Sequence, residues 1–114
     1  MTKKPEIIIA SGTADRRIQP LLYGIEEEEI PFRLAEIDEV EPIKRAYQGA
    51  IASQLSVGIA YDSEFAYLHF KNLPETTPLF KVSLTDTDQL NRLGANAARL
   101  VKGIPFKEIN EGGA

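Results

Sequence analysis

Four consecutive glutamates form the most concentrated group of potentially functional side chains in this sequence. They are Glu26 to Glu29, in the stretch GIEEEEIPFR, and an apolar segment follows them. If the run closes a helix, each acid lies near the partial negative charge of the last carbonyls, which costs about 0.3–1 kcal/mol at an exposed site. The residues alone leave two interpretations open: a solvated helix end, or an acid that contacts a metal ion or a partner protein.

Other residue types that could carry chemistry are sparse. His69 is the only histidine, so a histidine-based metal cluster is excluded, and we interpret His69 as a sheet residue without a catalytic role. The loop ASGTADRR follows the first apolar run but lacks the GxGxxG pattern and the P-loop lysine of phosphate-binding loops. A loop of small residues is common after the first strand of any α/β domain.

Two acidic pairs, Asp38 with Glu39 and Asp86 with Asp88, precede predicted helices. Acids are favoured at helix starts for electrostatic reasons, so we interpret both pairs as helix caps. The sequence contains no cysteine, which excludes disulfides and thiolate metal sites and fits a reducing cytoplasm.

The spacing of apolar residues from about 17 to 28 predicts a helix with one buried face. Pro20 falls in its first turn, where the missing N–H costs nothing. The apolar residues are Ile18, Leu21, Leu22 and Ile25.

The position of each glutamate on this helix follows from a rotation of about 100° per residue. Glu27 points directly away from the apolar face, whereas Glu29 would point into it if the helix continued. Because burying a lone carboxylate is unfavourable, we expect the helix to end near Glu28. Glu26 and Glu28 are expected to remain solvated.

The rest of the chain contains further strand and helix patterns. The connection 62–64 is so short that the strands around it must pair as an antiparallel hairpin. The last helix has Asp86 as its N-cap, Gln89 completing a capping box and Gly103 as its stop, and Gly94 and Ala97 on its apolar face predict a close contact with the sheet. The expected strands are 6–10, 32–37, 56–61, 65–70 and 79–84, and the other helices are 42–52 and about 86–103.

These elements predict an α/β fold, a three-layer α/β/α sandwich with a mixed five-stranded sheet and one antiparallel strand. We expect residues 1–114 to form one domain with a disordered tail at 110–114. The net charge of −4 gives no field that favours nucleic acid or an anionic membrane surface. The first apolar run is too short for a signal peptide or a membrane span.

Several segments resemble one known family. They are GIEEEEIPFRL, SVGIAYD with HFKNLPETTPLF, and LGANAARLVKGIPF. In their order and spacing they resemble the small subunit of the diol and glycerol dehydratase reactivating factors, and more distantly the medium subunit of the cobalamin-dependent dehydratases. The resemblance extends from the first helix to Phe106, and GANAARLVKGIPF is its most specific part.

The resemblance implies an accessory subunit without chemistry of its own. Such factors combine this small subunit with a large, actin-like ATPase subunit that holds ATP or ADP. They free a cobalamin-dependent diol or glycerol dehydratase from damaged cobalamin by exchanging subunits with it. Because the phosphate-binding motifs are absent, we expect the chain alone to hydrolyse no ATP and bind no cobalamin. We expect it to self-associate when isolated, because a surface that holds a partner is then left exposed. We expect it to act in the cytoplasm, in association with a bacterial microcompartment.

The resemblance also implies a role for one glutamate. In this family the second glutamate of the G-I-E-E motif reaches across the subunit interface to a magnesium-type ion held chiefly by aspartates of the large subunit. Glu27 occupies that position, and a carboxylate suits a hard cation. Family members commonly have glycine before I-P-F where this chain has Glu29, so we expect a glycine-like backbone conformation at the helix exit.

Two other functions stay open at this point. One is a medium-type structural subunit of a cobalamin-dependent dehydratase. Those subunits usually carry an additional N-terminal segment, whereas the first strand is expected here at residue 6. The other is a free-standing α/β domain that binds a small ligand, against which the missing phosphate-binding motifs count.

Overall fold

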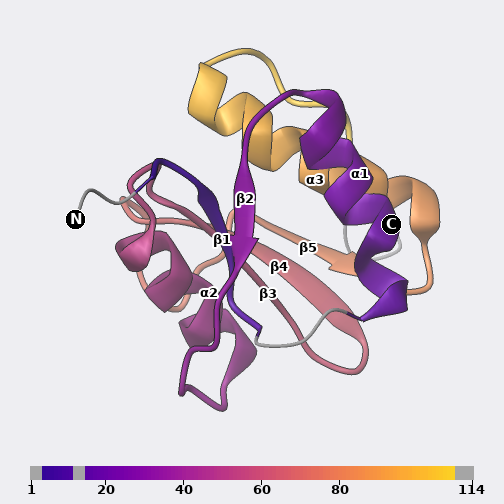
Figure 1. Ribbon diagram of the computed structural model, residues 1–114. Helices are drawn as coiled ribbons and strands as arrows, with labels where there is room; N and C mark the ends of the chain where they lie inside the picture. The colour runs from indigo at the N-terminus through magenta and orange to yellow at the C-terminus, as the bar shows by residue number, and fades with distance from the viewer. Residues whose placement is uncertain (1–3, 12–14, 110–114) are drawn as a thin grey trace.

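The computed structural model describes residues 4–11 and 15–109, and it contains a sheet of five strands in the order β2-β1-β3-β4-β5 (Figure 1). β1 is parallel to both β2 and β3, whereas β4 is antiparallel to both of its neighbours. The predicted mixed sheet with one antiparallel strand is therefore confirmed. The predicted tail at 110–114 lies outside the described residues. The strands are β1 (Ile7–Ile9), β2 (Phe32–Leu34), β3 (Val57–Tyr61), β4 (Phe65–Phe70) and β5 (Phe80–Ser83).

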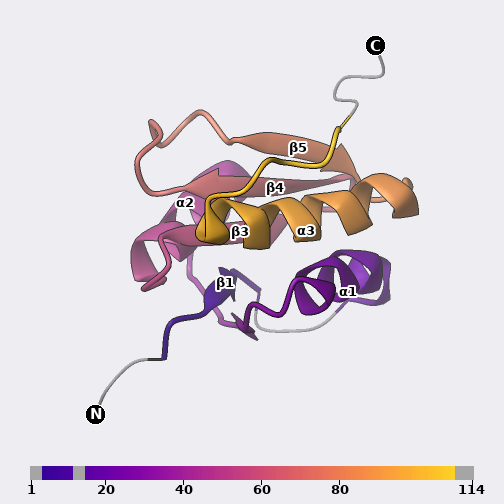
Figure 2. The same cartoon turned by 90° about the horizontal axis from the view of Figure 1, so that it is seen from above.

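Helices cover both faces of the sheet, which confirms the three layers. α2 (Pro42–Ala52) lies on one face, and α1 (Gln19–Glu27) and α3 (Thr87–Lys102) lie side by side on the other (Figure 1, Figure 2). A short 3-10 turn, η1 (Arg16–Ile18), leads into α1, and Pro20 lies in the first turn of α1 as expected. Among the described residues, no helix has both the length and the apolar character that crossing a membrane requires.

Side chains and one glycine set the ends of α2 and α3. Asp86 accepts a hydrogen bond from the Gln89 N–H at 3.1 Å, as the N-cap prediction requires. The acids at 38–39 lie just before α2, but Glu41 is the residue that caps it, accepting from two backbone N–H groups at 3.1 and 2.8 Å. α3 ends at Gly103, whose φ of 70° is left-handed, which glycine adopts without a steric cost.

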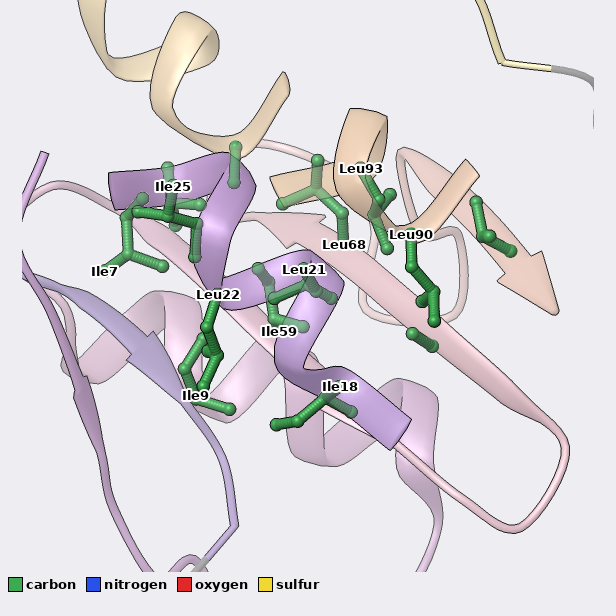
Figure 3. Close-up of a cluster of buried hydrophobic side chains, with 14 of the residues drawn as sticks. Ile7, Ile9, Ile18, Leu21, Leu22, Ile25, Ile59, Leu68, Leu90 and Leu93 are labelled. Atoms are coloured by element: carbon green, nitrogen blue, oxygen red, sulfur yellow. The ribbon is translucent and has the colours of Figure 1, made fainter. Parts of the chain in front are cut away.

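Alternation along the strands gives each face of the sheet its own set of buried side chains. The face under α1 and α3 holds most of the buried core, and burying one leucine or isoleucine side chain stabilises a fold by roughly 1.5–3 kcal/mol. Figure 3 shows this cluster, which includes Ile7, Ile9, Ile18, Leu21, Leu22, Ile25, Ile59, Leu68, Leu90 and Leu93. The face under α2 is lined by smaller residues, among them Ala10, Gly58 and Ala60, which let that helix approach closely.

Two glycines bring α1 and α3 into contact backbone to backbone. A Cβ atom on Gly94 would overlap the carbonyl oxygen of Leu21, and one on Gly24 would overlap the carbonyl oxygen of Asn91. The expectation that Gly94 contacts the sheet is therefore wrong, because α1 covers this side of α3. Ala97, one turn later, is buried in the cluster beneath the two helices.

After Gly103 the chain turns back along α3 (Figure 2). The buried amide of Asn96 accepts from the Lys107 N–H at 2.6 Å and donates to the Lys107 carbonyl at 2.9 Å, as a neighbouring strand would. The ring of Phe106 packs edge-on against Phe80 of β5, with the ring centroids 5.3 Å apart. The last described segment is thus fastened to both α3 and the edge of the sheet.

The contact between α1 and α3 predicts that Gly94→Ala lowers the free energy of unfolding by about 1–3 kcal/mol, because the added methyl group forces the helices apart. Gly49→Ala is the matched control within α2. A Cβ atom there would make ordinary contacts at 3.5 Å, and alanine is favoured over glycine in a helix by about 0.5–1 kcal/mol. Urea denaturation compares the two variants, and equal stabilities would contradict the close contact.

The exit from α1 predicts a stabilising substitution. Glu29 has a φ of 62°, the glycine-like conformation expected from the sequence. Because side chains disfavour this region, Glu29→Gly should raise the free energy of unfolding by about 1 kcal/mol. Glu26→Gly, inside the last turn of the helix, should lower it by about 1 kcal/mol. Shifts in the same direction for the two variants, measured by thermal and urea unfolding, would argue against strain at Glu29.

Candidate functional site

The end of α1 places the four glutamates in different surroundings. Glu26 and Glu27 lie on the last turn of the helix and are exposed. Glu28 is the C-cap and is only partly exposed, and Glu29 follows in its left-handed conformation with an exposed side chain. The predicted helix end and the outward direction of Glu27 are confirmed. The four acids therefore differ in backbone position and exposure and do not form one uniform acidic patch.

Glu28 is held by two cations from the last turn of α3. Its carboxylate lies 2.6 Å from Lys102 Nζ and 3.2 Å from Arg99 Nε, and its side chain is 13% exposed. Lys102 also donates to the backbone carbonyl of Glu28 at 3.0 Å. The expectation that Glu28 remains solvated is wrong, because α3 supplies partners that the local sequence of α1 does not reveal.

These contacts offset the repulsion between the Glu28 carboxylate and the partial negative charge at the C-terminus of α1. The hydrogen bond from Lys102 holds the pKa of Glu28 below its ordinary value, and Arg99 acts in the same direction against the opposing effect of partial burial. The two cations also lie where the negative ends of both helices meet. Glu28 thus fixes the end of α1 against α3 and is not available as a ligand.

The carboxylate of Glu27 accepts one long hydrogen bond through Oε1, and its other oxygen has no partner among the described residues. Its Oε1 accepts from Asn91 Nδ2 of α3 at 3.3 Å. Within residues 4–11 and 15–109, nothing else binds its carboxylate. An exposed carboxylate with an available oxygen fits a hard divalent cation such as Mg²⁺. Asn91 was not identified from the sequence, because it lies 64 residues from Glu27 along the chain and no local pattern joins the two.

A complete metal site would need ligands from outside this part of the chain. The described residues contain no group of three or more histidine, cysteine, aspartate or glutamate side chains that could hold a metal ion.

Tyr23 lies one turn before Glu27 on α1 and is 56% exposed. An exposed aromatic ring beside an available carboxylate is a composition that suits contact with a protein partner.

His69 lies in the sheet and has structural contacts. It is fully buried on β4, and its Nδ1 accepts from the Phe70 N–H at 3.0 Å. Its Nε2 lies 3.0 Å from the carbonyl of Glu75, and its ring packs edge-on against Tyr47 with centroids 5.0 Å apart. The side chain therefore ties β4 to α2 and to the following loop, in agreement with the interpretation as a sheet residue.

The crevice where α/β folds commonly bind ligands is occupied by an arginine. That crevice lies at the carboxyl ends of the parallel strands where the strand order reverses, here between β1 and β3. The guanidinium group of Arg45 donates to the carbonyls of Ala10 at 3.1 Å, Tyr61 at 2.6 Å and Glu39 at 2.9 Å. The sequence did not predict this contact, which counts against a small-ligand site at this position.

The ion pairs of Glu28 predict an acid-sensitive part of the stability. Because its folded pKa lies below the ordinary value of 4.5, its contribution is present above that pH and is lost as the pH falls through the folded pKa. Glu28→Gln should lower the free energy of unfolding by about 1 kcal/mol at neutral pH, with the difference shrinking in acid. Glu26→Gln, which removes an exposed acid that forms no ion pair with the described residues, should stay near wild type at neutral pH. Urea denaturation at several pH values measures both, and a pH-independent difference for Glu28→Gln would contradict the pairing.

Comparison with known proteins agrees with this architecture. The family model for the dehydratase medium subunit matches residues 4–107. The diol dehydratase-reactivating factor small subunit of Klebsiella michiganensis is 50% identical over 91 residues, which cover 79% of this chain and 73% of that protein. The propanediol dehydratase-reactivating factor small subunit of Salmonella typhimurium is 46% identical over 91 residues, covering 79% of this chain and 78% of that protein.

Solved structures show the same fold. A chain of the diol dehydratase-reactivating factor complexed with ADP and Mg²⁺ superimposes with a TM-score of 0.87 at 44% identity, covering 93% of this chain and all of that one. A chain of a glycerol dehydratase reactivase gives a TM-score of 0.82 at 32% identity, covering 94% of this chain and all of that one. The chain therefore belongs to the dehydratase medium subunit family, and the relatives it matches in that family are small subunits of dehydratase-reactivating factors.

Proposed function

We propose that this chain is the non-catalytic small subunit of an ATP-dependent, chaperone-like reactivating factor for a diol or glycerol dehydratase. The observation that carries the proposal is its 50% identity to a diol dehydratase-reactivating factor small subunit. The filled crevice at Arg45 supports a role through surface contacts rather than ligand chemistry. The cysteine-free sequence supports a cytoplasmic location, where the factor could associate with a bacterial microcompartment.

The proposed mechanism is an exchange of protein partners. ATP or ADP binds to a large, actin-like ATPase subunit and changes its affinity for this chain. The surface vacated by this chain then accepts the cobalamin-dependent dehydratase, whose disturbed subunit contacts release damaged cobalamin. A nucleotide can drive such an exchange only through different affinities for the two states of the complex. The surface of this chain that contacts the large subunit is exposed when the chain is isolated, and it would then let the chain self-associate.

We further propose that Glu27 supplies one ligand to Mg²⁺ at the interface with the large subunit. The exposed position of Glu27 and the available oxygen of its carboxylate support this role. The remaining ligands would come from the large subunit, since a single carboxylate does not satisfy a cation that prefers octahedral oxygen coordination. A structural relative was solved as a complex with ADP and Mg²⁺, which supports Mg²⁺ as the ion.

A second candidate is a structural subunit of a cobalamin-dependent dehydratase, which the description of the matching family favours. Purification of the native complex distinguishes the two functions. An actin-like ATPase recovered with this chain supports the reactivating factor. Large and small dehydratase chains recovered in fixed stoichiometry, with no ATPase, would instead identify a dehydratase subunit.

The interfacial role predicts that Glu27→Ala weakens binding to the large subunit by about tenfold or more in the presence of Mg²⁺, because one charged ligand is lost. Glu26→Ala is the matched control, since it removes a neighbouring exposed acid from the same helix turn. Isothermal titration of the purified large subunit, with Mg²⁺ and with a chelator, measures both variants. Identical affinities for Glu27→Ala and wild type under both conditions would rule out an interfacial ligand.

A further inference from the structure

A single amide on α3 contacts α1 at two points. Asn91 Nδ2 lies 3.0 Å from the carbonyl oxygen of Pro20 and 3.3 Å from Glu27 Oε1. A side-chain amide nitrogen carries two hydrogens, so these contacts use its whole capacity to donate. One hydrogen anchors the amide to the backbone of α1, and the other reaches the carboxylate of Glu27.

The surroundings of Asn91 restrict its movement. The backbone carbonyl oxygen of Asn91 lies against Gly24 of α1, where an added Cβ atom would overlap it. Gly24 stands between Pro20 and Glu27 along the helix, at spacings of four and three residues that share one side. The backbone of Asn91 is therefore held at the line where the two helices meet, and the hydrogen bond to the Pro20 carbonyl anchors the side-chain amide beside it.

We propose that Asn91 is a positioning residue that orients the Glu27 carboxylate for the divalent cation of the partner subunit. By binding Oε1 it leaves Oε2 without a partner among the described residues, and it limits the conformations of an otherwise exposed side chain. Groups that hold a metal ligand in place commonly contribute about 10–100-fold to metal affinity. This inference rests on the proposed function of Glu27.

The alternative is that Asn91 only joins the two helices through Pro20. A double-mutant cycle separates the two roles, because a residue that acts through Glu27 has no effect once Glu27 can no longer bind metal. The cycle consists of wild type, Asn91→Ala, Glu27→Gln and the double variant. Asn91→Leu is a second single variant that keeps most of the side-chain volume while removing the donor. Gln48→Ala is the matched control, since Gln48 on α2 makes a comparable amide contact with the Glu39 carboxylate at 3.5 Å.

The experiment measures the affinity of each folded variant for the purified large subunit as Mg²⁺ is titrated from a chelated baseline, with thermal melting as a check of folding. Asn91→Ala and Asn91→Leu should weaken the Mg²⁺-dependent affinity by about tenfold in the wild-type background. Neither should weaken it further in the Glu27→Gln background, and Gln48→Ala should change nothing.

Two results would overturn the inference. One is an unchanged Mg²⁺-dependent affinity for Asn91→Ala and Asn91→Leu, and the other is an equal loss in both backgrounds, which would show a purely structural role. If Glu27→Gln itself has no effect on the Mg²⁺ dependence, the proposed function of Glu27 fails, and this inference fails with it. If Glu27→Gln has an effect but Asn91 shows no coupling to it, only this inference fails.

Discussion

The close contact between α1 and α3 is the constraint on which the rest of the structure depends. α1 has only nine residues, and a helix shorter than about 12–15 residues is marginal in water without tertiary contacts. Gly24 and Gly94 let the two backbones touch, and this fixes the rotation of α1 about its own axis. Leu21 and Ile25 then point into the core, and Glu27 points out beside α3.

The same contact explains how acids can end α1. The last turn of α3 places Arg99 and Lys102 where both helices have the negative ends of their dipoles, so two cations serve two helix ends. Glu28 takes both of them. Glu27 is left with a neutral amide as its partner. A carboxylate without a cation at a helix C-terminus carries an electrostatic cost that an external cation would relieve.

Much of the fold could be predicted from the sequence because hydrophobic periodicity is local information. It gave the sheet class, the helix ends near Glu28 and Gly103, and the outward direction of Glu27. Periodicity tells which residues are buried but not which element covers them, so the partner of Gly94 was predicted wrongly. The partners of Glu28 lie 71 and 74 residues away along the chain, and Asn91 lies 64 residues from Glu27. No local pattern could have joined them.

The position of Arg45 bears on where this fold can act. An α/β sheet usually offers the crevice at the carboxyl ends of its strands to a ligand, but here three carbonyls around that crevice are bound by the protein's own guanidinium group. This arrangement agrees with a function at the outer surface, where in the proposed function Glu27 would offer one ligand to a cation that needs roughly six oxygens. Since no single subunit would complete such a site, metal binding and subunit assembly would be linked reciprocally, each strengthening the other by the same factor.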